Sequence, residues 1–171
     1  DDMKQLIEGY TKFWAAAHNK NMLTEKLMTR PLWEQDAEAV ENEMDSFRRQ
    51  FIKFEKDFKG KDMTDEAEIA ASAQEQCMDF LNDYHPLMTL LCTRGLKKRH
   101  WDSINKLTGL FIPYAQNANL KQMINYGLHK HVDAITDTCI NASKEFSLEQ
   151  AMDKMEEEWA PMVFGSKAWK D

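Results

Sequence analysis

One Gly-Lys pair, Gly60-Lys61, is the only place where the sequence approaches a nucleotide-binding loop. A P-loop closes on Gly-Lys-Ser/Thr, because its backbone amides cradle phosphate and its hydroxyl holds magnesium. Here Asp62 stands where the hydroxyl is required, and Glu55 stands where the first glycine should be. A carboxylate beside phosphate would repel it. The sequence therefore predicts no P-loop.

The histidines do not fit the Glu-x-x-His motif through which helical bundles hold paired iron ions. None of the five follows a glutamate at that spacing, and the residues three positions earlier are Ala15, Asn82, Lys97, Tyr126 and Leu128. His129 and His131 are two residues apart, so a helix would point them to different sides. We expect no metal site.

Cys77, Cys92 and Cys139 are an odd number of cysteines at wide spacings, which fits neither a disulfide framework nor a C-x-x-C metal pair. Free cysteine usually behaves as a small buried apolar residue, so we expect reduced thiols. Cys-His catalysis stays open, without a local signature. The sequence identifies no catalytic residue, no cofactor-binding residue and no metal ligand.

A basic cluster, Arg94, Lys97, Lys98 and Arg99, comes just before His100-Trp101. The cluster has three interpretations: a solvated turn, an ion pair between Arg99 and a carboxylate of an adjacent helix, or a nucleic-acid contact. The net charge of −7 and the absence of a recognised motif weaken the last. We favour the ion pair, with Trp101 packed inward.

Composition indicates a helical chain. The 171 residues are 43% hydrophobic and 30% charged, an ordinary globular balance. Six glycines and four prolines are too few for a sandwich or barrel of many short strands. No apolar stretch approaches the ~20 residues of a membrane span, and we expect no signal peptide. Because the chain starts at Asp1 without methionine, we expect a fragment of a longer protein.

Hydrophobic periodicity predicts an all-α fold, an elongated bundle of about seven or eight helices without substantial sheet. The first helix should stop before Pro31, and the second spans residues 37–58 with apolar residues at alternating steps of three and four. That spacing also permits a coiled coil, but packing within a bundle is favoured. Further helices are expected at 65–84, after Pro86, and at 96–108, 119–126 and 128–146, with a loop at 110–118. Ser147-Leu148-Glu149-Gln150 fits a capping box and predicts that a separate helix starts there.

The large apolar side chains on these helical faces are the core candidates. They are Trp14, Phe47, Phe51, Phe54, Phe58, Phe80, Trp101, Phe146 and Trp159. The run Glu156-Glu157-Glu158 before Trp159 is interpreted as a solvated face, with the tryptophan turned inward.

The order of several motifs resembles the dynein heavy chain, in the helical region at the end of the tail and the start of the linker. Its two most specific marks are Arg99-His100-Trp101 and the pattern Lys144-Glu145, Leu148-Glu149, Met155-Glu156 and Trp159. The resemblance covers residues 80–164 strongly, and residues 1–60 more loosely, through Trp14, His18 and Pro31. It favours an axonemal over a cytoplasmic heavy chain.

The resemblance implies a non-catalytic, tail-proximal part of the linker in an ATP-driven microtubule motor. It divides the chain into long N-terminal helices at 1–60 and a linker-like bundle at 64–171. No cofactor belongs to this fragment, and ATP and magnesium are expected elsewhere in the parent chain. The implied partners are the AAA+ ring and tail of the heavy chain and dynein intermediate or light chains, with microtubules reached only through the parent chain and neither nucleic acid nor membrane bound. The implied location is the cytoplasm and cytoskeleton, including the axoneme of a cilium or flagellum.

Two other classes stay open. One is a helical interaction or scaffold module that docks partners through an apolar face. A dimer held by the 37–58 face would favour this class. The other is a stand-alone helical enzyme. A bound metal or a buried polar pocket would favour that class.

Overall fold

Helices make up most of the described structure, a computed structural model that covers residues 2–115, 117–163 and 165. No strand occurs among these residues, and the one β-type contact is an isolated antiparallel bridge between Pro31 and Asn119. The predicted all-α class is therefore confirmed. The helices are α1 (Asp2–Thr29), α2 (Ala37–Lys59), α3 (Thr64–Asp79), α4 (His85–Leu91), α5 (Lys98–Thr108), α6 (Leu120–Asn125) and α7 (Val132–Trp159).

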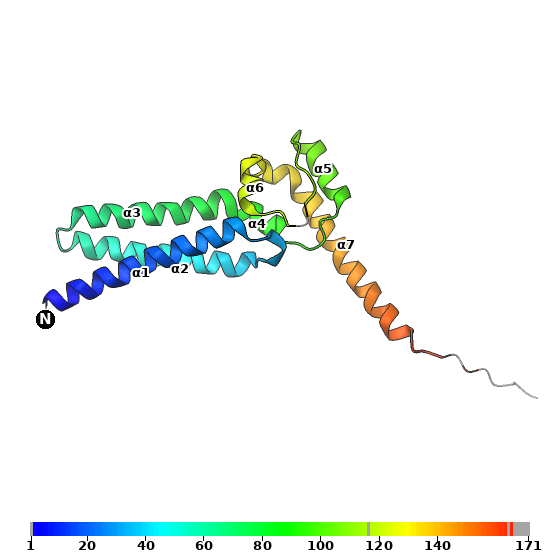
Figure 1. The fold of residues 1–171 in the computed structure, drawn as a ribbon, viewed down its shortest axis with the longest axis horizontal. Coiled ribbons are helices and arrows are strands. Elements are labelled where there is room, and N and C mark those ends of the chain that lie inside the picture. The colour runs from blue at the N-terminus through cyan, green and yellow to red at the C-terminus, as the bar shows by residue number, and fades with distance from the viewer. Residues whose placement is uncertain (1, 116, 164, 166–171) are drawn as a thin grey trace, which may run out of the picture.

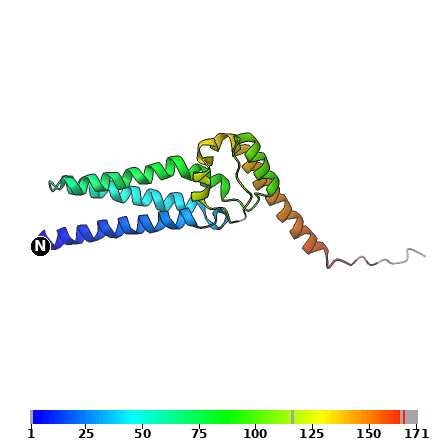
Figure 2. The same cartoon turned by 45° about the horizontal axis from the view of Figure 1, so that its top comes forward.

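The fold has an elongated arm and a smaller head. In both views α1, α2 and α3 lie side by side along the arm, with the N-terminus at its free end (Figures 1 and 2). The short helices α4 and α6 lie at the other end of the arm. There α5 packs on α7, and the C-terminal part of α7 extends away from the rest of the chain (Figure 1).

Aromatic side chains hold the arm together. Asp36 caps α2, since its carboxylate accepts hydrogen bonds from the backbone of Glu38 and Ala39. The α2 phenylalanines then meet Phe13 of α1 edge-on, with ring centroids 5.4–6.2 Å apart, the geometry that aromatic quadrupoles prefer. These rings belong to Phe51, Phe54 and Phe58. The 37–58 face is thus covered by α1 and α3 within the chain, so it is not free to form a coiled-coil dimer.

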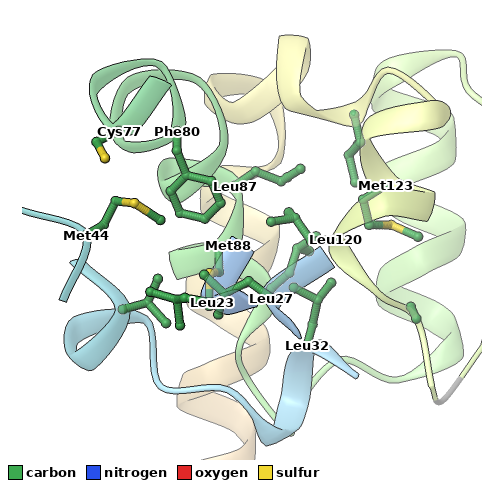
Figure 3. Packing of buried hydrophobic residues seen from close by; sticks show 14 of the residues in the cluster. Leu23, Leu27, Leu32, Met44, Cys77, Phe80, Leu87, Met88, Leu120 and Met123 are labelled. Atoms are coloured by element: carbon green, nitrogen blue, oxygen red, sulfur yellow. The ribbon is translucent and has the colours of Figure 1, made fainter. Parts of the chain in front are cut away.

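The core continues into the head through side chains from several helices. Leu27 of α1, Met44 of α2, Leu87 of α4 and Leu120 of α6 converge on one cluster, drawn in Figure 3. All four are buried. Close packing of this kind fixes the arm to the head, because the interior has little room for relative movement.

A π-helical turn, Phe80–Tyr84, joins α3 to α4. Pro86 has no N–H to donate to the carbonyl of Asn82, and its ring would clash with that carbonyl in a regular α-helix. The wider turn relieves the clash, and the His85 N–H donates to the Phe80 carbonyl five residues earlier. The predicted new helix at Pro86 is present as α4.

The predicted helix start at Ser147 is wrong, because α7 runs without interruption from Val132 to Trp159. The Ser147 hydroxyl donates to the carbonyl of Ser143, 3.1 Å away, instead of capping a new helix. No glycine or proline interrupts residues 132–159, so nothing ends the helix at that point.

Two core candidates are exposed. Trp159 is 63% exposed, because no described residue packs on α7 beyond the region where α5 covers it. Trp14 is 56% exposed, because it follows Phe13 on α1 and only Phe13 faces α2. Placing these two tryptophans in the core was therefore wrong. The structure buries Phe51, Phe58, Phe80 and Trp101 and half-buries Phe47, Phe54 and Phe146.

Candidate functional site: the junction of α5 with α7

His100 caps the N-terminus of α5. The backbone N–H of Lys97 donates to His100 Nδ1, 3.1 Å away, as the side chain of a glutamate or glutamine does in a capping box. Because Nδ1 accepts this bond, the ring proton lies on Nε2, which donates to Glu145 Oε2 at 3.1 Å. The ring is buried, so one side chain both starts α5 and ties it to α7.

Two ion pairs flank this histidine. Arg99 Nη2 donates to Glu145 Oε2, and Lys97 Nζ donates to Glu149 Oε1. Residues four apart on a helix lie on the same face, so α7 presents both carboxylates to α5. Sequence reasoning expected Arg99 to pair with a neighbouring helix, and the structure places it on Glu145 of α7.

The charges of this junction shift each other's pKa. The hydrogen bond from Arg99 lowers the pKa of Glu145, and the same bond raises the pKa of Arg99. A carboxyl group with a lowered pKa stabilises the fold above its ordinary pKa of 4.5, and that stabilisation is lost as pH falls through the lowered value.

We expect Glu145→Gln to flatten the loss of stability in acid. Between roughly pH 5 and pH 3, wild type should lose more free energy of unfolding than the variant, because only wild type protonates this carboxylate. Urea denaturation at a series of pH values measures the difference. Glu157→Gln, an exposed substitution further along α7, is the control and should follow wild type. Parallel curves for Glu145→Gln and wild type would contradict the assignment.

Gly95, in the connection between α4 and α5, lies very close to α7 beside the ion pairs. A Cβ atom built on Gly95 would lie 2.8 Å from the Cβ of Phe146 and closer still to the carbonyl oxygen of Ala142. Only glycine at position 95 leaves space for α7 to pack here. The polar contacts and this close approach together fix α5 against α7.

The far end of α5 is anchored as well. Gly109, in the left-handed conformation with φ 70°, ends the helix. The side-chain amide of Asn105 donates to the carbonyl of Ile112 at 2.8 Å and accepts from its N–H at 2.9 Å. The loop that follows α5 is thereby pinned back onto the helix.

A buried lysine crosses from α1 to α3 in the arm. Lys20 is 7% exposed, and its Nζ donates to Gln76 Oε1 at 2.5 Å. Burial lowers the pKa of this lysine, because the charged form loses its hydration. Nearer the free end of the arm, the Tyr10 hydroxyl donates to Glu66 Oε1 at 2.5 Å.

Replacing the buried lysine by an apolar residue should stabilise the arm. The lowered pKa means that charged Lys20 disfavours the fold below that pKa, and the penalty fades as pH rises towards the ordinary 10.5. We expect Lys20→Met to raise the free energy of unfolding by about 1 kcal/mol at neutral pH, because Gln76 is exposed and can be hydrated instead. Lys26→Met, at an exposed position of α1, should change little. Chemical denaturation at neutral pH and near pH 10 tests this, and a destabilised Lys20→Met at neutral pH would contradict it.

Burial keeps the cysteines protonated. It raises the pKa of Cys92 and of Cys139 to about 12, and it also raises that of Cys77. A thiolate is the nucleophile and metal ligand, so thiols with these pKa values are unreactive at neutral pH. Within the described part of the chain, no three side chains of His, Cys, Asp or Glu gather closely enough to hold a metal ion. Among the same residues, no helix is both long enough and apolar enough to cross a membrane.

Sequence reasoning named Arg99, His100 and Trp101 but did not identify most of their partners. Glu145 and Glu149 appeared only as parts of a motif, and nothing in the sequence singled out Gly95 as a packing residue. Gly95 lies more than forty residues from its contacts on α7, so no local pattern could reveal them. The spacing of the two glutamates, four residues apart, was the one usable signal.

Comparison with known proteins gives a consistent family. The family described as "Dynein heavy chain, N-terminal region 2" matches residues 1–171. The chain is 28% identical to dynein axonemal heavy chain 3 of Mus musculus over 162 residues, which is 95% of this chain and 4% of that protein. It is 28% identical to dynein axonemal heavy chain 1 of Homo sapiens over 168 residues, 98% of this chain and 4% of that protein.

A third relative extends the alignment over the full sequence. Dynein axonemal heavy chain 12 of Rattus norvegicus is 24% identical over 172 aligned residues, 100% of this chain and 6% of that protein. The chain thus spans a small part of the length of each of these relatives. Because the family match covers every residue, the chain belongs to the dynein heavy chain family, in its N-terminal region 2.

Proposed function

We propose that this chain is a non-catalytic mechanical segment of an axonemal dynein heavy chain, in the tail-proximal part of the linker. It passes the nucleotide-driven movement of the AAA+ ring to the tail. ATP and magnesium act in the ring, and microtubules are reached only through the parent chain. The names of the relatives support an axonemal, ciliary location.

The observation that carries this proposal is the junction of α5 with α7. A lever must transmit force without bending, and force passes best through contacts that leave no alternative packing. Here α7 is held by a buried histidine and by two ion pairs. On neighbouring turns it also contacts a glycine that lies too close to α7 to carry any side chain. Beyond this junction α7 continues as one helix for about 15 Å, from Glu149 to Trp159.

Interrupting α7 beyond the junction tests the proposal. In a dynein heavy chain that carries this segment, Asp153→Pro removes a helical hydrogen bond at an exposed position and kinks the helix. We expect microtubule gliding to slow by about twofold or more, while ATP hydrolysis in solution continues. Asp153→Ala keeps the helix and should leave both rates unchanged. Gliding that is unaffected by the proline would contradict a mechanical role for α7.

A second candidate, a helical interaction module, is favoured by the distal part of α7. Leu148, Met152, Met155 and Trp159 recur at steps of three and four and are each at least 60% exposed. Acidic residues flank this stripe, among them Glu149, Asp153 and Glu156. The matching partner is a helix with an apolar stripe bordered by lysine or arginine.

Protease cleavage distinguishes the two candidates. If a partner helix covers the stripe in the parent heavy chain, the double variant Met152→Ser and Met155→Ser should expose α7 and speed its cleavage. Glu157→Ser, on the opposite face, is the matched control. Equal cleavage of the double variant and the control would exclude the interaction module.

A further inference from the structure

A pocket of about 340 Å³ opens where four separate segments of the head meet. The turn after α1 contributes Leu32 and Trp33, the connection between α4 and α5 contributes Arg94, α5 contributes Trp101, and the loop after α5 contributes Tyr114. Its volume lies in the range of ligand sites, and most of its lining is apolar.

The walls of this pocket are held by hydrogen bonds, so the pocket exists before any ligand arrives. The Leu32 N–H donates to the Ala118 carbonyl at 2.9 Å, beside the bridge between Pro31 and Asn119. This contact ties the turn after α1 to the loop after α5. Trp101 of α5, which forms another wall of the pocket, is 5% exposed and is therefore held in the core.

Arg94 differs from the other cations of its cluster. Lys97, Lys98 and Arg99 each pair with a carboxylate. Among the described residues, no carboxylate forms an ion pair with Arg94. Its guanidinium carbon lies 5.5 Å from the centre of the Trp33 ring. A guanidinium stacked on an aromatic face keeps the N–H groups of its edge free, and these groups can bind a carboxylate through two hydrogen bonds.

The rim of the pocket fits a polypeptide. Trp33 is 38% exposed and Tyr114 is 43% exposed, so the apolar surface continues outward from the pocket. A chain segment lying across the rim would cover both rings, which a small buried ligand would not.

We propose that this pocket binds a segment of another protein in which a carboxylate side chain adjoins a large apolar or aromatic side chain. The apolar side chain enters between Trp33 and Trp101, and the carboxylate accepts hydrogen bonds from Arg94. The interaction adds a partner-binding site to the mechanical role and does not depend on it.

The test measures binding of short fluorescent peptides to the 171-residue chain by fluorescence anisotropy. The probe contains Glu-Glu-Trp, and two matched peptides contain Lys-Lys-Trp and Glu-Glu-Ala. We expect the probe to bind and each matched peptide to bind at least about tenfold more weakly, because each lacks one of the two anchors. Absence of binding by the probe, or equal binding by the lysine peptide, would overturn the proposal.

Variants then locate the site. Arg94→Gln should weaken probe binding about tenfold or more, and Arg94→Lys should weaken it less, since lysine keeps the charge but not the two-pronged geometry. Lys53→Gln, an exposed charge on α2, is the matched control and should bind as wild type does. In NMR spectra the indole N–H signals of Trp33 and Trp101 should shift on binding while that of Trp14 stays in place. Equal affinity of the Arg94→Gln and Lys53→Gln variants, or a shift confined to Trp14, would place binding elsewhere and overturn the proposal.

Discussion

Gly95→Ala should lower the free energy of unfolding by about 3 kcal/mol or more, the largest effect we expect from a single methyl group in this chain. The added Cβ would overlap the backbone of α7 at Ala142 and the Cβ of Phe146. Backbone cannot rotate away as the end of a long side chain can, so the connection that leads into α5 and α7 must move apart. The ion pairs of the junction would then lose their geometry as well.

Gly9→Ala is a control that should change the free energy of unfolding in the opposite direction. Gly9 lies inside α1, and a Cβ there would meet nothing within 4 Å. Alanine favours helix over glycine, so this variant should gain about 0.5–1 kcal/mol. Chemical denaturation of both variants measures the pair. A Gly95→Ala protein as stable as wild type would show that α5 and α7 are not in close contact.

Trp101→Ala should cost about 3–5 kcal/mol, the usual range for truncating a large buried aromatic side chain. The indole is 5% exposed and lines the pocket of the head together with Leu32, Leu91 and Leu96. Its removal would enlarge that pocket and remove the apolar contacts that the indole makes there. Equilibrium denaturation gives the loss directly.

The matched control for this variant is Trp14→Ala. Trp14 is 56% exposed, so its removal should cost under about 1 kcal/mol. Equal costs for the two tryptophans would mean that Trp101 is not buried as the structure places it.

Local signals predicted much of this fold, because helix starts and stops depend on nearby residues. Pro31 ends α1, Gly109 ends α5, and Asn119 caps α6 by accepting a hydrogen bond from the Gln122 N–H. Apolar residues at steps of three and four on α2 predicted which face packs, and Phe51 and Phe58 are buried there.

Features that depend on distant residues could not be predicted in the same way. Ser147 carries a capping pattern, but the same letters are compatible with the middle of a helix when nothing else ends it. Trp159 has the spacing of a core residue, yet no described element reaches that part of α7 to cover it. Arg99 was expected to form an ion pair, but its partner Glu145 lies 46 residues away and only the fold selects it.

The candidate site was predictable only in its basic half. Lys97, Arg99 and His100 are close together in the sequence, whereas the carboxylates that pair with them come from α7. The mechanical role came from the resemblance to the dynein heavy chain rather than from any chemistry of the residues. The family match over the whole sequence confirms the resemblance itself.

Stiffness across the junction is the central claim, and pulsed electron paramagnetic resonance measures it most directly. Spin labels at Ser103 of α5 and Glu157 of α7 occupy exposed positions on either side of the contact. If the junction is stiff, the distances between the labels should form one narrow distribution, which Gly95→Ala should broaden. A broad or two-peaked distribution in the otherwise unaltered chain would show that α7 swings relative to α5, and would contradict a segment that transmits force as one body.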